Sequence, residues 1–504
     1  MHDQRKVKQE IDAKTRERHL VEVQEFTTLY DSLLEQRKQS VYTEKVLHQL
    51  TNLLRKNPEA YTMYNYRRCA LLHIWSEARQ QAEAAAATTT TTTTDNSTET
   101  TVKEQHPVRT ELDWLKDELI LSSSILLSDY KVYAAFVHRR WIFTQLRRLA
   151  EEALTASSTT ITTTVSSSNK PNGVGRGACP EVVRFWESAL LKEKRQCDAL
   201  LMRDERNFHA WNYRRWALRE LAQMKQLLAQ FGVELEATPS RSNSVGKEET
   251  PSAEWQQQQR PGDLDSKPML SSSLFTSEEL RELRFTTMMV RRNFSNYSAW
   301  HQRGLVLKTA LKRLEERPAD DAVRVAALEE AWTRLEEDLV LVITAVYCDP
   351  ADQSAWYYAQ FLTRAAGTVQ CMSPAPSTSR VDVTGRLVEA CIELVAEEKR
   401  LGGEAEAYWP RLYLFTTLLS LFGKTNAKNT SSSGINCDGG SAAALIREVC
   451  EALGTSDLAA SGDHYDAGND KVRLLQELAA QFSRADPLRA GMHQCLLAAA
   501  VPPQ

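Results

Sequence analysis

A short segment recurs five times along this 504-residue chain, and an internal repeat of this kind constrains the fold more than any single local signal does. Its pattern is an aromatic residue, two spacers, a second aromatic residue, two spacers and an arginine. The copies begin at Tyr61, Tyr133, Phe208, Tyr297 and Gln353. The last copy departs from the pattern, because Gln353 replaces the first aromatic residue and Ala359 the arginine.

The spacing of the repeat is typical of one face of an α-helix, on which residues three and six or seven positions apart lie near one another. We therefore expect Tyr133, Phe136 and Arg139 to form one stripe with two buried rings. A buried arginine head group requires a carboxylate or a backbone carbonyl as its partner.

Each copy follows a companion segment whose apolar residues recur at helical spacing. The companions are residues 44–56, 111–127, 181–203, 277–292 and 321–347. Short polar turns separate the two segments of a pair. They contain Asn, Asp and Ser, which cap helices, and Pro, which fits the first helical turn. The sequence thus predicts an all-α solenoid of antiparallel helix pairs. We expect almost wholly helical structure in residues 17–80, 111–153, 181–232, 275–316 and 321–365.

Low-complexity stretches interrupt this pattern and cannot bury enough apolar surface to offset the entropy of ordering. Within the repeats they are residues 84–110, 155–179 and 236–273, for which we predict disorder. Towards the C-terminus they are residues 367–383, 424–441 and 455–470. We predict one helical repeat domain over residues 1–365 and a helical C-terminal extension over residues 366–504.

Composition argues against several classes of function. The net charge of −4 predicts no nucleic-acid binding. The nine cysteines form no paired framework or CxxC motif, which favours reduced thiols in a cytoplasmic protein. No apolar run is long enough for membrane insertion, and the longest, Leu412 to Phe422, predicts a buried helix.

The sequence contains no self-contained catalytic motif. It lacks a phosphate-binding glycine loop, a GxSxG motif and a metal-binding signature. His138 and His209 lie beside repeat aromatics, where a packed or hydrogen-bonded core histidine is a more common finding than a catalytic base. A chain of this kind is expected to be a scaffold or one subunit of a larger enzyme.

The repeats resemble those of the alpha subunits of protein prenyltransferases. The words that carry the resemblance are Asn207–Arg215 (NFHAWNYRR), Asn293–Trp300 (NFSNYSAW) and Asp349–Trp356 (DPADQSAW). They occur in order, and the resemblance covers residues 1–80 and 111–365 apart from the inserts. It implies a right-handed α-α superhelix and a separate beta subunit as partner.

Within that family, three features resemble the Rab geranylgeranyltransferase class. The opening residues 1–8 are similar, Phe208 stands where the farnesyl and type I subunit has Tyr, and Ala134 replaces a Gln that binds the CaaX carboxylate. The resemblance implies transfer from geranylgeranyl diphosphate to C-terminal cysteines of Rab GTPases, which a Rab escort protein presents. The shared farnesyltransferase and type I alpha subunit is the alternative within the family, and a non-enzymatic tetratricopeptide-like adaptor is the alternative outside it.

The resemblance also implies roles for individual residues. The beta subunit would hold the zinc ion that activates the acceptor thiolate. Lys131 matches the family lysine near the diphosphate, where an ammonium group stabilises the charge that develops on the leaving group. Tyr133 is a weaker candidate, since its ring can also pack in the core. His2 is a hypothetical ligand to the beta-subunit zinc, which it would occupy until the substrate cysteine displaces it.

Overall fold

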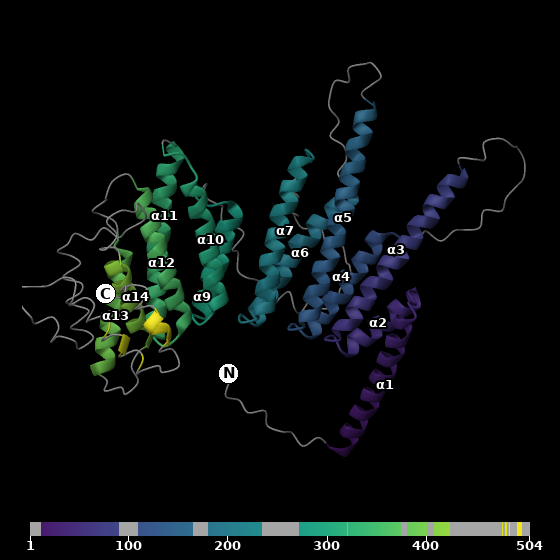
Figure 1. Ribbon diagram of the computed structural model, residues 1–504, viewed down its shortest axis with the longest axis horizontal. Helices are drawn as coiled ribbons and strands as arrows, with labels where there is room; N and C mark the ends of the chain where they lie inside the picture. The colour runs from purple at the N-terminus through teal and green to yellow at the C-terminus, as the bar shows by residue number, and fades with distance from the viewer. Residues whose placement is uncertain are drawn as a thin grey trace, which may run out of the picture. The chain divides into compact units, whose positions relative to one another are not determined.

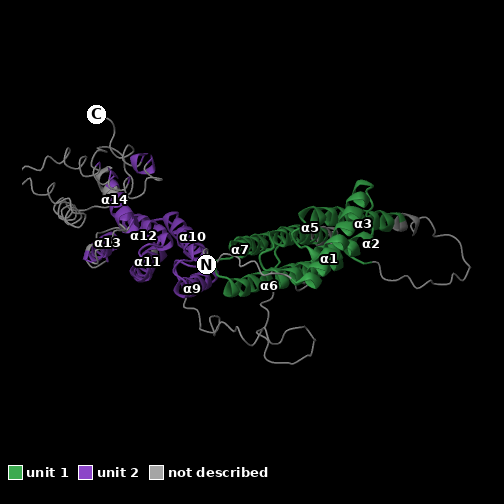
Figure 2. Cartoon of the chain, turned by 90° about the horizontal axis from the view of Figure 1, so that it is seen from below, with its two compact units in different colours: residues 1–249 green, residues 250–504 purple. Residues whose placement is uncertain are grey.

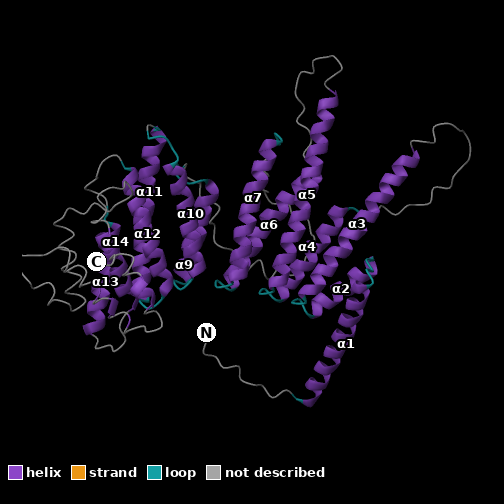
Figure 3. Ribbon diagram, viewed as in Figure 1, coloured by secondary structure: helices purple, strands orange, loops and turns teal. Residues whose placement is uncertain are grey.

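The structure is a computed structural model, and the chain divides into two compact units, residues 1–249 and 250–504, which we describe separately (Figure 2). The residues that it describes are 12–89, 109–164, 180–233, 272–319, 321–373, 381–400, 408–423, 476, 479, 480, 483 and 491–495. Within these residues every regular element is a helix, as Figure 3 shows. This confirms the predicted all-α fold of helix pairs.

The first unit contains an N-terminal helix and three helix pairs. Its helices are α1 (Ala13–Lys38), α2 (Glu44–Lys56), α3 (Tyr61–Thr89), α4 (Glu111–Ser128), α5 (Tyr133–Thr164), α6 (Glu181–Arg203) and α7 (Phe208–Gln230). Helices α3, α5 and α7, which each begin with a repeat, pack successively against one another (Figure 1). The companion helices α2, α4 and α6 pack against them as the first member of each pair.

The second unit repeats this arrangement. Its helices are α9 (Ser277–Arg292), α10 (Tyr297–Glu315), α11 (Ala322–Cys348), α12 (Gln353–Met372), α13 (Val383–Arg400) and α14 (Tyr408–Gly423). Helices α13 and α14 form a further pair that packs against α11 and α12. The predicted buried helix at Leu412 to Phe422 is thus α14, in which Leu414 and Phe415 are fully buried.

Each of the five repeat pairs turns at an Asn or Asp that follows the last residue of the first helix, and in the first four of them this residue has an extended conformation. The side-chain Oδ1 of this residue accepts a hydrogen bond from the backbone N–H two residues further on, at 3.0–3.1 Å, which closes the turn. The turn residues are Asn57, Asp129, Asp204, Asn293 and Asp349. This local chemistry explains why the sequence predicted the helix boundaries closely.

Three helices run beyond their expected ends. Helix α3 continues to Thr89 and α5 to Thr164, into the stretches at 84–110 and 155–179 for which disorder was predicted. In α3 the extension includes an alanine run, and alanine has the highest helix propensity of the amino acids. Helix α12 likewise reaches Met372, inside the stretch at 367–383.

The other parts of the predicted inserts lie largely outside the described residues, as do residues 424–441 and 455–470. The predicted boundary between residues 365 and 366 stays a prediction. Among the described helices, none combines the length and the apolarity that a bilayer crossing requires.

Candidate functional site

The four repeat arginines are buried, and three of them join one helix pair to the next, whereas Arg214 on α7 donates from Nε to Asp198 on α6 of its own pair at 2.6 Å. Arg139 on α5 donates from Nε to Glu193 Oε2 on α6 at 2.9 Å, and its Nη2 forms a second bond to Glu193 Oε1. Its Nη1 donates to the Leu119 carbonyl at 3.1 Å and to the Ser122 hydroxyl at 2.7 Å, both on α4. One side chain thereby connects its own pair, α4–α5, with the next companion helix.

The same arrangement recurs at two other repeats. Arg67 on α3 donates to Glu118 on α4 at 2.7 Å and to the Leu47 carbonyl on α2 at 2.7 Å. Arg303 on α10 donates to Asp338 on α11 at 3.0 Å and also to a carbonyl on α9. These contacts confirm the expectation that a buried repeat arginine needs carboxylate and carbonyl partners.

In four of the five copies, the residue before the arginine position binds a carboxylate twenty residues earlier in the chain, whereas Tyr66 in the first copy donates to the Val41 carbonyl. His138 lies 2.8 Å from Glu118, and the Tyr213 hydroxyl donates to Glu193 at 2.8 Å. Tyr358, in the copy that lacks arginine, donates to Asp338 in the same way. His138 is thus a hydrogen-bonded core histidine, as predicted, and burial lowers its pKa.

Three of the second aromatic residues are tryptophans that fix the turn before their helix. Trp211, Trp300 and Trp356 are buried, and each indole N–H donates to a backbone carbonyl six residues earlier, at 2.8–2.9 Å. Tyr64 and Phe136 take the place of tryptophan in the first two copies and are also buried. These positions therefore serve the core and the turns rather than chemistry.

The first aromatic residue of the repeat is exposed, contrary to the expected single stripe. Tyr61, Tyr133 and Phe208 in the first unit are 48%, 55% and 59% exposed. At 3.6 residues per turn, six residues correspond to a rotation that leaves the first aromatic about 120° away from the arginine. The core alternative for Tyr133 is therefore wrong, and an edge of exposed rings follows the turns of α2–α3, α4–α5 and α6–α7.

Lys131 lies on this edge, in the turn between α4 and α5. Its Nζ is 2.8 Å from Asp204 Oδ2 in the next turn, between α6 and α7, and its side chain is 59% exposed. The hydrogen bond that the Lys131 ammonium donates to the Asp204 carboxylate raises the pKa of Lys131. The ammonium group is therefore charged and held at the surface.

Tyr133 and His209 lie beside this lysine turn. Their rings contact each other with centroids 5.2 Å apart, and the Tyr133 backbone N–H donates to Glu59 Oε1 at 3.3 Å. Burial lowers the pKa of His209, with Glu59 and Lys131 acting in opposite directions on it. The structure thus brings Lys131, Tyr133 and His209 to one exposed edge, whereas His2 lies outside the described residues.

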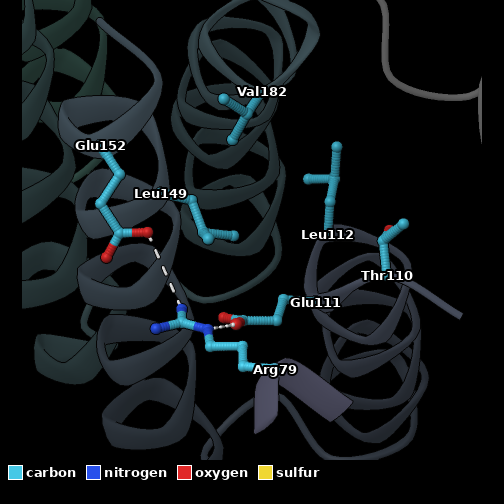
Figure 4. A pocket seen from close by; sticks show the side chains of 7 residues that line it. All are labelled: Arg79, Thr110, Glu111, Leu112, Leu149, Glu152 and Val182. Carbon is cyan, nitrogen blue, oxygen red and sulfur yellow. Dashed lines mark hydrogen bonds and ion pairs between the residues drawn. The ribbon is translucent and has the colours of Figure 1, made fainter. Parts of the chain in front are cut away.

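A second feature of the first unit is a pocket formed by α3, α4, α5 and the start of α6, with a volume of about 330 Å³ (Figure 4). Arg79 forms ion pairs in it with Glu111 at 2.6 Å and with Glu152 at 3.8 Å. Arg148 also pairs with both carboxylates. The charges of the pocket are balanced within the protein, and we assign no ligand to it.

No group of three metal-binding side chains capable of holding an ion occurs in the part of the chain that the structure describes. The sequence reasoning missed Asp204 as the partner of Lys131. It also missed the carboxylates that bind the repeat arginines. Three of these carboxylates, Glu118, Glu193 and Asp338, lie twenty residues before the residue that precedes the next arginine position, and this spacing was a signal in the sequence that could have identified them.

Comparison with known proteins agrees with this arrangement. Residues 190–221, 280–310 and 335–366 match the family model "Protein prenyltransferase alpha subunit repeat". The chain is similar to proteins named "Geranylgeranyl transferase type-2 subunit alpha". It is 22% identical to that of Candida albicans over 69% of the chain and 68% of the relative. It is 25% identical to that of Rattus norvegicus over 72% of the chain and 41% of the relative.

The relative from Saccharomyces cerevisiae is 21% identical over 68% of the chain and 65% of its own length. The chain thus spans about two thirds of the two fungal relatives and 41% of the rat one. The matched family repeats contain Arg303 and the carboxylates Glu193 and Asp338, which join helix pairs, and Arg214, which bonds to Asp198 within its own pair. Repeat sequence, helix pairing and similarity along most of the chain agree, and the chain contains repeats that match the protein prenyltransferase alpha-subunit repeat model.

Proposed function

We propose that this chain is the alpha subunit of a heterodimeric Rab geranylgeranyltransferase. The reaction would transfer geranylgeranyl groups from geranylgeranyl diphosphate to C-terminal cysteines of Rab GTPases presented by a Rab escort protein. The relatives named type-2 alpha subunits support this class over the farnesyl and type I class. The repeated arginine–carboxylate contacts argue for a rigid scaffold that presents one edge to a partner.

The observation that carries the proposal is the exposed edge around Lys131. At this edge the Lys131 ammonium lies near the partly exposed rings of Tyr133 and His209. The edge therefore combines a positive charge with apolar surface. Exposed aromatic rings are typical anchors of protein–protein interfaces. We assign this edge to contact with a beta subunit and with the diphosphate of the lipid substrate.

The chemistry proposed for this chain is electrostatic. As the carbon–oxygen bond to the diphosphate breaks, negative charge grows on the leaving group, and the Lys131 ammonium stabilises that charge. Tyr133 takes a secondary place beside it. A zinc ion held by the beta subunit would activate the acceptor cysteine by stabilising its thiolate form. The role of His2 as a displaceable zinc ligand remains a separate prediction.

Co-expression tests the proposal. The full chain is produced with the type-2 beta subunit and, separately, with a farnesyl-type beta subunit from the same organism, and stable pairs are isolated. We expect a heterodimer with the type-2 beta subunit that prenylates a Rab substrate with its escort protein and leaves a CaaX peptide unmodified. Assembly only with the farnesyl-type subunit would establish the alternative class, and assembly with neither would favour the adaptor.

A further inference from the structure

The carboxylate of Asp204 has two separate contacts. Its Oδ1 accepts the backbone N–H of Arg206 at 3.1 Å and closes the turn between α6 and α7. Its Oδ2 lies 2.8 Å from the Lys131 ammonium in the turn between α4 and α5. Only the first of these contacts belongs to the helical repeat.

The other turns show that a negative charge is unnecessary for turn formation. Asn57 and Asn293 occupy the same position and accept the same backbone hydrogen bond, at 3.1 and 3.0 Å, with a neutral amide. Asp349 makes the bond at 3.1 Å with a carboxylate. The turn therefore does not require the negative charge of Asp204, and this charge pairs with the Lys131 ammonium.

The backbone around Lys131 is also fixed from the neighbouring turn. Asn207 donates from Nδ2 to the Tyr130 carbonyl at 2.9 Å, and the Arg203 guanidinium lies 4.4 Å from the Tyr130 ring centroid. The Asp204 side chain is only 20% exposed, so its bond to the lysine is shielded on one side. With backbone and ammonium both anchored, the long lysine side chain loses most of its freedom before any ligand binds.

We propose that Asp204 is a positioning residue for Lys131, which it holds at the edge where the leaving diphosphate would lie. This inference rests on the proposed function. An unanchored lysine must be ordered during the reaction, and ordering one flexible side chain costs about 0.5–1.5 kcal/mol. Because Asp204 also offsets the positive charge of the lysine, its removal should slow the chemical step without weakening diphosphate binding.

The test compares Asp204→Asn with Asp349→Asn in the heterodimer with the type-2 beta subunit. Both substitutions keep an oxygen for the turn, but only the first removes a contact to a lysine. Single-turnover rates are measured with geranylgeranyl diphosphate, a Rab substrate and its escort protein, and diphosphate affinity is measured by fluorescence titration. We expect Asp204→Asn to lower the rate roughly two- to tenfold with equal or tighter lipid binding. Asp349→Asn should match the wild type.

A double-mutant cycle with Lys131→Ala separates positioning from structure. In the Lys131→Ala background, Asp204→Asn should cause no further loss of rate. An equal loss in both backgrounds, a full rate for Asp204→Asn alone, or a full rate for Lys131→Ala would each overturn the inference. An inactive wild-type heterodimer would instead refute the proposed function itself.

Discussion

The buried ion pair between Arg139 and Glu193 should contribute more to the free energy of unfolding than an exposed ion pair does. The substitution Glu193→Gln tests this. The carboxylate accepts from two nitrogens of Arg139 and from the Tyr213 hydroxyl. A glutamine of the same shape keeps one acceptor oxygen and turns an NH₂ group towards these donors. The substitution thus leaves a buried guanidinium without a counter-ion and a buried donor without an acceptor.

The expected loss follows from burial. Both side chains are 2–3% exposed, and breaking a buried ion pair by removing one partner costs about 3–5 kcal/mol. For a unit of this size, each kcal/mol of lost stability lowers the midpoint of thermal unfolding by about 2–4 °C. The substitution should therefore lower that midpoint by roughly 6–20 °C. Glu152→Gln is the matched control, since its pair with Arg148 has side chains 32% and 53% exposed and should contribute less than about 1 kcal/mol.

Urea denaturation of the purified full chain, followed by circular dichroism, measures the free energy of unfolding, and hydrogen exchange locates the change. We expect Glu193→Gln to raise the exchange of α4, α5 and α6 before that of the second unit. A loss below about 1 kcal/mol, equal to that of the control, would show that the buried pair does not hold the helix pairs together.

Three further outcomes are expected. Burial raises the pKa of Glu118, but Arg67 and His138 outweigh it and set the pKa to about 2, below the usual 4.5. The stability from this group should therefore be complete above pH 4.5 and fall towards pH 2, and urea midpoints of wild type and Glu118→Gln should converge over that range. Trp300→Phe removes the indole bond to a carbonyl and should lower the free energy of unfolding by about 1–3 kcal/mol in urea titration. Tyr133→Ala, at an exposed ring, should change that free energy by less than about 0.5 kcal/mol and weaken beta-subunit binding in a titration.

The helices and their turns could be predicted from sequence because their causes are local. The turn residues Asn57 and Asp204 bind backbone two positions away, so their effect is visible in the sequence itself. The exposed first aromatic residue was mispredicted because three-residue spacing was extended to six residues, where the helical rotation no longer matches. A register count corrects this without a structure.

The lysine site could be predicted only in part. Lys131 and Tyr133 were candidates through the family resemblance, but the partner of the lysine is 73 positions away, at Asp204 (204 − 131). The sequence around either residue does not predict this ion pair, because the pair depends on how two helix pairs pack together. The arginine partners present the same difficulty, with 51 positions between Arg67 and Glu118.

The antiparallel pairing also decides where the chain can change in length. Each of α3, α5 and α7 starts at a short turn and therefore ends at the opposite side of the first unit. A segment inserted at the end of α3 or α5 is thus attached on the side away from the turn that carries Lys131. Evolution can therefore lengthen this protein at one side while conserving the distances at the other, and a fluorescent domain or affinity tag placed after Thr89 should leave partner binding intact.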